Sequence, residues 1–523
     1  VVLTDDVFRT EKEDGYSRLN IVSQWSYPNR VIQSALQVAK LPANIQLIQL
    51  NSFGCGPDSF IMDEATAILK KAGKNLTIVR IDEIASPGAV RLRLRSLLES
   101  LKNRNCSVDA IDKVDYRGYQ VSYTKKDKQK TILIPWMCDF LNPFAPALGE
   151  LAGYKVENLP KSDRLSVDLG LKYGHNEVCY PSTLVVGDII KALQSGKYDL
   201  NNVVVSITQT GGQCRATNYI AQIKTALERA GYSGIPVLAL TAGKTYQNDQ
   251  RAFKLPVLKL ANIAIYTVLY GDAIQQMYAA VKPREKRKGD TQKVFDFYME
   301  VGTEAVRTND SRRLMSLLKE AVADFNTISV YEKKLEKIGL IGEIFVKYNN
   351  YAQAFMTDWL RDKGMEVVTP PIMDFLVQFF VNSKVQEEYG SKKKNLLLSA
   401  SRPLLWKYFN RKMTECEDIL KQFRYYSSTE SIFKKAEYAR EAVSLSNQFG
   451  EGWMIAAEVA SFARSGVNKV VCIQPFGCIA NHIVAKGIEK RLKKLYPNTS
   501  ILYLDLDGGM GEVNLQNRLH FMT

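Results

Sequence analysis

Residues 471–478 read Val-Cys-Ile-Gln-Pro-Phe-Gly-Cys, and residues 48–55 read Ile-Gln-Leu-Asn-Ser-Phe-Gly-Cys. In both stretches an apolar run leads into the tripeptide Phe-Gly-Cys, and the two copies lie near opposite ends of the chain. Apolar residues at helical spacing follow each cysteine, and a further apolar run comes at 76–81 in one copy and at 499–504 in the other. This pattern predicts a strand, a cysteine loop, a helix and a second strand, built twice as two half-sites that face each other.

The rest of the chain continues the alternation of strands and helices. An amphipathic helix at 219–230 lies between two buried strands at 202–207 and 235–240. A further α/β unit begins at 338–346 and resumes after a helical block. We therefore expect the α/β class, with several Rossmann-like parallel-sheet units around a central cleft and with helical insertions.

These patterns divide the chain into five predicted segments. Two α/β units come first, a helical connector follows, and a third α/β unit is interrupted by a helical insertion. The first unit contains the Cys55 loop, the second contains the Cys179 and Cys214 loops, and the third contains the Cys478 loop. The predicted boundaries are 1–113, 114–271, 272–336, 337–371 together with 452–523, and 372–451 for the insertion.

The chain has 523 residues and a formal net charge of +15, which suits either a solvated basic surface or an acidic, phosphate-bearing partner. No basic motif with interleaved aromatic residues points to nucleic acid. No apolar run reaches the ~20 residues of a membrane span. We expect no nucleic-acid partner, no membrane segment and a cytoplasmic location. Because the chain starts Val-Val-Leu-Thr without Met, we also expect it to be the downstream part of a longer polypeptide.

Four of the eight cysteines share one predicted setting, namely a strand end, a Gly or Pro neighbour, and a following helix. The carboxyl ends of parallel strands are where α/β sheets bind ligands. A helix N-terminus at such a place favours the thiolate, the form of cysteine that binds metal. These candidate metal ligands are Cys55, Cys179, Cys214 and Cys478.

Further residues around these loops are candidates for the same site. Cys138, at the end of a predicted strand, is a fifth candidate ligand, whereas Cys106, Cys416 and Cys472 fit small buried hydrophobes better. Arg215 could stabilise the charge of a cluster or a substrate anion, or form a surface salt bridge. Glycines allow backbone N–H groups to approach an inorganic sulfide. The candidate glycines are Gly54, Gly211, Gly212 and Gly477.

Histidine offers an alternative metal. His175 lies four residues before Cys179, and His482 lies four residues after Cys478. Two cysteines and two histidines suit tetrahedral zinc, although Cys55 and Cys214 would then need another explanation. Motifs for nucleotide hydrolysis are weak, because the glycine pair in 338–346 stands alone and Thr241–Thr245 lacks the upstream glycine of a phosphate loop.

Several stretches in combination resemble one protein family. The family is that of the large proteins related to the 2-hydroxyacyl-CoA dehydratase activator and its iron–sulfur component, which are also grouped with the double-cubane cluster proteins. The chain is similar to their C-terminal part from about residue 20 onward. The matching stretches are 53–60, 175–181, 211–215, 338–346 and 474–482.

The resemblance implies an iron–sulfur cluster, either [4Fe-4S] or double-cubane, at these cysteines. It also implies that an activase-type ATPase, on an upstream domain or on a partner subunit, drives low-potential electrons onto the cluster, so that ATP acts only through that ATPase. A small molecule or an acyl-CoA would be the substrate, and a cluster shared between chains would make a homo-oligomer. The alternative is a non-enzymatic scaffold that docks an ATPase domain and binds zinc or no metal.

Overall fold

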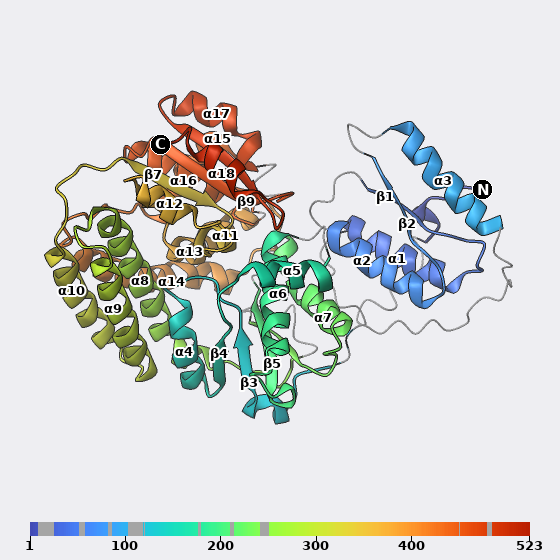
Figure 1. The fold of residues 1–523 in the computed structure, drawn as a ribbon, viewed down its shortest axis with the longest axis horizontal. Helices are drawn as coiled ribbons and strands as arrows, with labels where there is room; N and C mark the ends of the chain where they lie inside the picture. The colour runs from blue at the N-terminus through green and yellow to red at the C-terminus, as the bar shows by residue number, and fades with distance from the viewer. Residues whose placement is uncertain are drawn as a thin grey trace. The chain divides into compact units, whose positions relative to one another are not determined.

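The structure is a computed structural model that describes residues 1–8, 26–51, 58–81, 86–102, 119, 121–175, 179–209, 214–240, 250–448, 450–478 and 484–523 (Figure 1). Its strands form small sheets of parallel pairs flanked by helices, which confirms the predicted α/β class with helical insertions. The chain divides into two compact units. Unit 1 comprises Val1–Tyr123, Arg164–Ser195 and Ser206–Arg251; unit 2 comprises Thr124–Asp163, Gly196–Val205 and Ala252–Thr523. The two units do not test the boundaries of the five predicted segments, which remain predictions.

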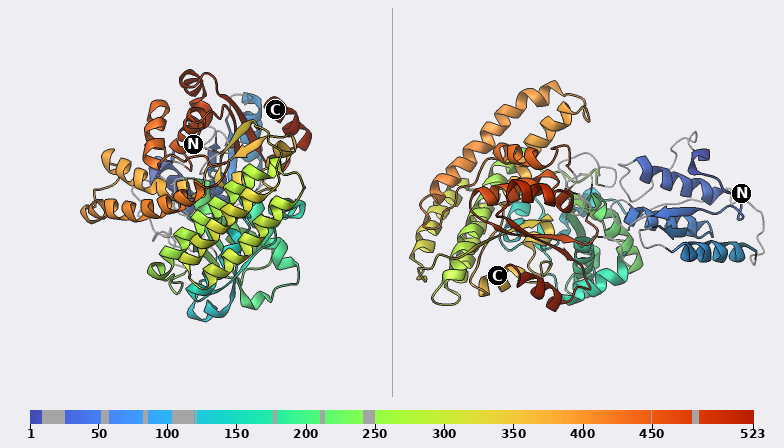
Figure 2. Two further views of the ribbon diagram at one scale, coloured as in Figure 1. Left: turned by 90° about the vertical axis from the view of Figure 1, so that its left-hand side faces the viewer. Right: turned by 90° about the horizontal axis from the view of Figure 1, so that it is seen from above.

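The N-terminal part of unit 1 is built on a pair of parallel strands, β1 (Ile48–Asn51) and β2 (Thr77–Arg80). Helices α1 (Ser26–Lys40) and α2 (Asp58–Lys71) pack on each other, because both present buried apolar residues at helical spacing. Helix α3 (Pro87–Lys102) lies against β2, on the face of the strand pair opposite α1 (Figure 2).

The second part of unit 1 is mainly helical. It contains α5 (Arg164–Tyr173), α6 (Tyr180–Gln194) and α7 (Tyr219–Arg229). Helices α5 and α6 approach closely because each has a glycine at the contact. An added Cβ would lie 2.0 Å from the Thr183 carbonyl oxygen at Gly170, and 1.6 Å from the Ser166 carbonyl oxygen at Gly187.

A four-stranded sheet has the order β4-β3-β5-β6. Strand β3 pairs in parallel with β4 and with β5, as the alternation of strands and helices predicts. Helix α4 (Ala145–Ala152) joins β3 to β4 and ends at Gly153, whose φ of 81° is the left-handed conformation that closes many helices. The strands are β3 (Thr131–Ile134), β4 (Lys155–Asn158), β5 (Val203–Thr208) and β6 (Val237–Leu240).

The C-terminal sheet of unit 2 has the order β10-β9-β7-β8, and all its pairs are parallel. Two segments that are distant in sequence form this sheet, since a helical block separates β8 from β9. The strands are β7 (Lys337–Gly342), β8 (Glu366–Val368), β9 (Lys469–Pro475) and β10 (Ser500–Leu506). The helices that accompany them are α11 (Ile344–Tyr348), α12 (Met356–Asp362), α16 (Trp453–Arg464), α17 (Glu489–Leu495) and α18 (Glu512–Leu519).

Long helices make up the rest of unit 2. Helices α8, α9 and α10 pack side by side, and α14 contacts α8 and α10 (Figure 2). One apolar core runs through these helices and the C-terminal sheet. The helices are α8 (Val257–Val281), α9 (Asp290–Arg307), α10 (Ser311–Thr327), α13 (Ile372–Glu388), α14 (Leu396–Leu420) and α15 (Ile432–Ala442).

Among the described residues, one helix is long and apolar enough to cross a membrane, by length and composition alone. This segment, Val257–Arg284, contains α8. Its Tyr270, Ile274 and Met277 are fully buried against neighbouring helices, and Asp272 lies in its middle.

The two Phe-Gly-Cys copies have the same topology but not the same register. When the two cysteines are aligned, β1 and β2 fall within β9 and β10. Ile48 pairs with Thr77 in the first copy. Val471, the equivalent of Ile48, pairs with Leu502, which lies two positions beyond the equivalent of Thr77. A slip of two positions keeps every side chain on its original face of the sheet, so both registers are compatible with the same alternation.

The close contact between α5 and α6 leads to a prediction for unit 1. Gly187→Ala should destabilise the unit by about 2 kcal/mol or more, because an added methyl group overpacks a helix contact that cannot relax without moving backbone. Urea unfolding should show a lower midpoint. Gly234→Ala is the matched control, since no heavy atom lies within 4 Å of a Cβ added there. Equal midpoints for the two variants would contradict the prediction.

Candidate functional site

The predicted site residues fall into three groups. One group lies outside the described residues. Because Cys55 belongs to this group, the predicted facing of Cys55 and Cys478 lies outside them as well. The other two groups lie in unit 1 and in unit 2. The groups are Gly54, Cys55, Gly211 and Gly212 outside the described residues, Cys179, Cys214 and Arg215 in unit 1, and Cys138, Gly477 and Cys478 in unit 2.

Cys179 is the N-cap residue of α6. Its carbonyl oxygen accepts the N–H of Ser182 at 2.8 Å, and its Sγ accepts the O–H of Tyr219 at 3.1 Å. The side chain is buried. The N-terminus of α6 presents the positive end of its dipole to the sulfur, and the phenol adds a hydrogen-bond donor. Both contacts stabilise an anionic sulfur.

Cys214 has the equivalent position before the next helix. It is the N-cap residue of a short 3₁₀ helix (Arg215–Asn218) that continues directly into α7. Tyr219 is the first residue of α7, so its bond to Cys179 joins the Cys179 loop to the helix that follows Cys214. Two cysteine loops predicted separately are therefore brought to neighbouring helix starts. Arg215 is only 6% exposed, which makes a surface salt bridge a poor account of it.

His175, the histidine of the zinc alternative, lies next to an acid of α2. Its Nε2 is 3.4 Å from Oδ1 of Asp63, and Arg229 approaches the same oxygen at 3.5 Å. Burial lowers the pKa of His175, and the charges of Arg229 and Arg80 lower it further, while Asp63 opposes the shift. The imidazole is therefore neutral at neutral pH, the form that binds metals.

The second Phe-Gly-Cys tripeptide forms a tight turn at the end of β9. The N–H of Cys478 donates to the carbonyl oxygen of Pro475 at 3.1 Å, and Gly477 between them has a φ of 70°. A four-residue turn with positive φ at its third position is of type II and favours glycine there. The turn conformation alone therefore accounts for a glycine at position 477.

Asp505, the acid at the end of β10, has a structural role beside this turn. Its carboxylate accepts a hydrogen bond from Gln474 and another from Lys486 at 2.8 Å. Gln474 is fully buried, and its Oε1 has no hydrogen-bond partner among the described residues. Asn51, the equivalent residue of the first copy, is also buried with an unpartnered Oδ1. Each copy therefore places a buried amide four residues before its cysteine.

The carboxyl ends of β7 and β9 meet at the switch point of the sheet, where β8 continues to one side and β9 to the other. Ligands bind at such points in α/β sheets. Glu343 follows β7, and its N–H donates to Ile473 on β9 at 3.1 Å. Gly342 permits this approach, because its φ is 124° and an added Cβ would lie 1.8 Å from the Ile473 carbonyl oxygen. Glu343 therefore lies at the same sheet edge as the Cys478 turn.

Glu343 and Glu451 form a pair of acids at this edge. Oε1 of Glu451 accepts the N–H of Ile344 at 2.8 Å, and Oε2 of Glu343 accepts that of Val346 at 2.8 Å. Burial raises the pKa of both carboxyls, and the charge of Glu451 raises that of Glu343 further, whereas Lys347 opposes both shifts. The pair consequently keeps a proton to higher pH than ordinary carboxyls do.

The remaining described cysteines are buried. Burial raises the pKa of the Cys138 thiol to about 12, and it also raises the pKa of Cys416 and Cys472. A thiolate is therefore costly at these three positions. Cys138, predicted as a fifth ligand, is therefore poorly suited to binding a metal.

In the part of the chain that the structure describes, no three His, Cys, Asp or Glu side chains lie together as metal ligands would. Two thiols at neighbouring helix starts in unit 1 are what the described residues offer an iron–sulfur cluster. Their donor chemistry fits that group, since thiolates are its usual ligands.

Reading the sequence did not identify Tyr219, Glu343 or Glu451 as site residues. Tyr219 begins a predicted helix five residues after Cys214, and Glu343 directly follows the glycine pair of 338–346. For Glu451 the sequence does contain a cue, because the residue lies between Gly450 and Gly452. In the structure both glycines have a φ of 54°. Glycine adopts positive φ at little steric cost, so a glycine on each side of a charged residue can mark a tight turn in the sequence.

The Glu343–Glu451 pair predicts how stability depends on pH. The folded state retains protons that the unfolded chain releases, so the free energy of unfolding should fall as pH rises from 5 to 8. Glu451→Gln removes one titrating carboxyl and keeps an acceptor for Ile344, so the fall should shrink by on the order of 1 kcal/mol. Urea unfolding at four pH values measures this. Glu300→Gln, on an exposed position of α9, should keep the wild-type slope; an unchanged slope in Glu451→Gln would refute the assignment.

Comparison with known proteins gives this chain no family. It matches no protein-family model and no curated protein.

Proposed function

We propose that this chain is the iron–sulfur component of an ATP-driven, low-potential electron-transfer system related to 2-hydroxyacyl-CoA dehydratases and their activators. The observation that supports the proposal most is the hydrogen bond from Tyr219 to the sulfur of Cys179. It attaches the Cys179 loop to the helix that follows Cys214, so two cysteines from separate loops adjoin neighbouring helix starts. A cytoplasmic location and an activase-type ATPase partner belong to the same proposal.

The proposed ligands are the four loop cysteines, Cys55, Cys179, Cys214 and Cys478. When bound, an iron–sulfur cluster would supply one-electron transfer at low potential. Tyr219 and the N-terminus of α6 favour an anionic sulfur at Cys179 and hold its position. Arg215 provides a buried positive charge next to Cys214, which would offset part of the negative charge that thiolates bring.

Glu343 and Glu451 would serve as the proton store of the same system. The raised pKa of Glu343, about 8, leaves a proton available at neutral pH, and the pKa of Glu451 is raised as well. Both acids lie at the sheet edge that ends in the Cys478 turn. A reduction that takes up electrons usually takes up protons as well, and a buried carboxyl of this kind can deliver them. An acyl-CoA or another small molecule is the proposed substrate class.

One observation favours the alternative function, a scaffold that docks an ATPase domain and binds zinc. His175 is neutral and directs Nε2 toward Asp63. A carboxylate behind a histidine is the usual arrangement when the other ring nitrogen binds zinc. Cys179, four residues later, would be a second ligand.

Metal analysis tests the proposed ligands. After anaerobic reconstitution the wild type should contain iron and sulfide, and Cys179→Ala or Cys214→Ala should retain less than half of the iron, because an alanine cannot bind it. Cys416→Ala, which removes a buried thiol of α14, should keep the wild-type content. A wild type that takes up zinc but no iron, and loses the zinc in His175→Ala, would replace the proposal by the scaffold.

The Tyr219 hydrogen bond gives a second, independent test. Tyr219→Phe removes the donor to Cys179 and leaves the ring in place. If the sulfur binds iron, the midpoint potential should become more negative by roughly 40 mV, the equivalent of one ordinary hydrogen bond of about 1 kcal/mol. Redox titration measures the shift, and Tyr232→Phe in the same unit is the control. Equal potentials in the two variants would exclude Cys179 as a ligand.

A further inference from the structure

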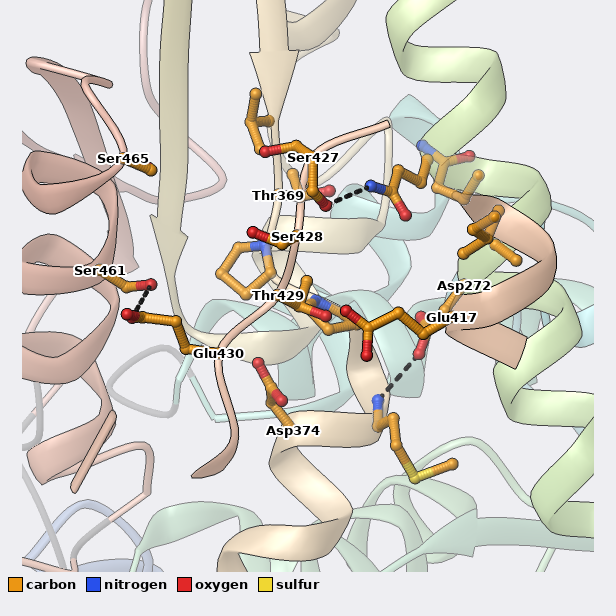
Figure 3. A pocket seen from close by; sticks show the side chains of 18 of the residues that line it. Asp272, Thr369, Asp374, Glu417, Ser427, Ser428, Thr429, Glu430, Ser461 and Ser465 are labelled. Carbon is orange, nitrogen blue, oxygen red and sulfur yellow. Dashed lines mark hydrogen bonds between the residues drawn. The ribbon is translucent and has the colours of Figure 1, made fainter. Parts of the chain in front are cut away.

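Unit 2 contains a cavity of about 410 Å³ beside β8, the edge strand of its C-terminal sheet (Figure 3). Its walls come from α8, α13, α14, α16 and the segment that joins α14 to α15. The volume is in the range of small-molecule sites, which are roughly 300–1,000 Å³. Among the described residues, those of the Cys478 turn do not line the cavity.

The lining of the cavity is acidic, although the chain as a whole is strongly basic. Six carboxylates line it, against the three cations Lys337, Lys435 and Arg464. A recess lined by an excess of one charge attracts ligands of the other charge. The six acids are Asp272, Glu366, Asp374, Glu417, Glu430 and Glu458.

Three of these acids already have a cation of the protein as partner. Glu366 contacts Arg284 at 2.6 Å and Lys337 at 3.3 Å, Asp374 forms a buried ion pair with Lys435, and Oε1 of Glu458 lies 3.3 Å from Nζ of Lys347. These pairs hold the walls together. The other acids that line the cavity have no such cation among the described residues.

The other three acids are held by neutral donors alone within the described structure. Asp272 accepts the N–H groups of Ile372 and Met373, both at 2.9 Å, and so caps α13. Glu417 accepts the O–H of Tyr426 at 2.5 Å. Glu430 accepts the O–H of Tyr438 at 2.5 Å and that of Ser461 at 3.2 Å, as Figure 3 shows for Ser461. Burial raises the pKa of Asp272 to about 7, which reflects how poorly the cavity solvates negative charge.

Glu458 has an oxygen with no partner at all among the described residues. The residue is 4% exposed, and its Oε1 lies 3.3 Å from Nζ of Lys347. Its Oε2 is buried and has no hydrogen-bond partner. A buried carboxylate oxygen without a partner costs free energy that a ligand's N–H group would recover.

Hydroxyl groups and aromatic rings complete the cavity. The loop of Ser427, Ser428 and Thr429 passes between the helix of Ser461 and the helices of α8 and α14, and the carboxylates of Asp374 and Glu417 are directed toward the same space (Figure 3). The ring of Tyr348 lines the cavity too. Aromatic faces attract ammonium groups, and hydroxyls bond to amines.

We propose that this cavity binds a small organic cation, an aliphatic amine whose ammonium group bonds to Oε2 of Glu458. A metal ion fits less well, since in the described chain no three ligating side chains converge. Further amino groups of the ligand would face Glu417 and the Ser427–Thr429 loop. The site does not depend on the proposed iron–sulfur function.

Calorimetric titration with putrescine and spermidine tests the proposal, with 1,4-butanediol as the neutral analogue of putrescine. One amine should bind per chain and the diol should not. Glu458→Gln should weaken amine binding by about tenfold or more, because it removes the charge that the ammonium group contacts. Glu300→Gln removes an exposed acid of α9 and should bind like the wild type.

Three results would overturn the proposal: no amine binding, equal binding of the diol, or amine binding that survives Glu458→Gln in a folded protein. Circular dichroism shows whether the variant is folded. If it is not, Glu417→Gln takes its place, since the amide oxygen can still accept the O–H of Tyr426. Binding unchanged in that variant would refute the site equally. The titrations use protein with and without reconstituted iron, so failure of the iron–sulfur proposal would not affect the outcome.

Discussion

The pairing of β7 with β9 is the constraint on which unit 2 depends. The register from Ile338↔Lys469 to Gly342↔Ile473 joins strands that are distant in sequence, and it tolerates no side chain at Gly342. This pairing puts Glu343 at the sheet edge where the Cys478 turn begins. It also leaves β8 as an edge strand, with the long helices and their cavity beside it. One backbone contact thus organises both proposed sites of the unit.

Lys347 links these two sites electrostatically. It lies 3.3 Å from Glu458, which lines the cavity, and its charge also lowers the pKa of Glu343 and Glu451 at the switch point. A buried cation among three acids contributes little net stability, because desolvation offsets most of the attraction. Its effect is to couple the charge states of its neighbours. The charge states of Glu343, Glu451 and Glu458 therefore depend on one another through Lys347.

Much of the fold could be predicted because local patterns determine it. The helix predicted at 219–230 forms as α7, and the strands predicted at 202–207 and 235–240 form as β5 and β6, since apolar runs and Gly or Pro residues mark their ends. The site was less predictable. Glu343 and Glu451 are distant in sequence, and only the β7–β9 pairing with the Gly450–Gly452 turn brings them together. The bond from Tyr219 to Cys179 likewise depends on the packing of α6 against α7, which no local pattern encodes.

The slip between the two similar strand pairs makes the halves electrostatically unlike. Register places Arg80 opposite Asn51 in the first copy, but Asp505 opposite Gln474 in the second. The buried amide of one copy therefore has a basic neighbour across the strand pair, and its counterpart has an acidic one. The two copies have the same order of strands and loop. The register shift of two residues places side chains of opposite charge beside their buried amides. Exchanging one half for the other would not yield the same protein.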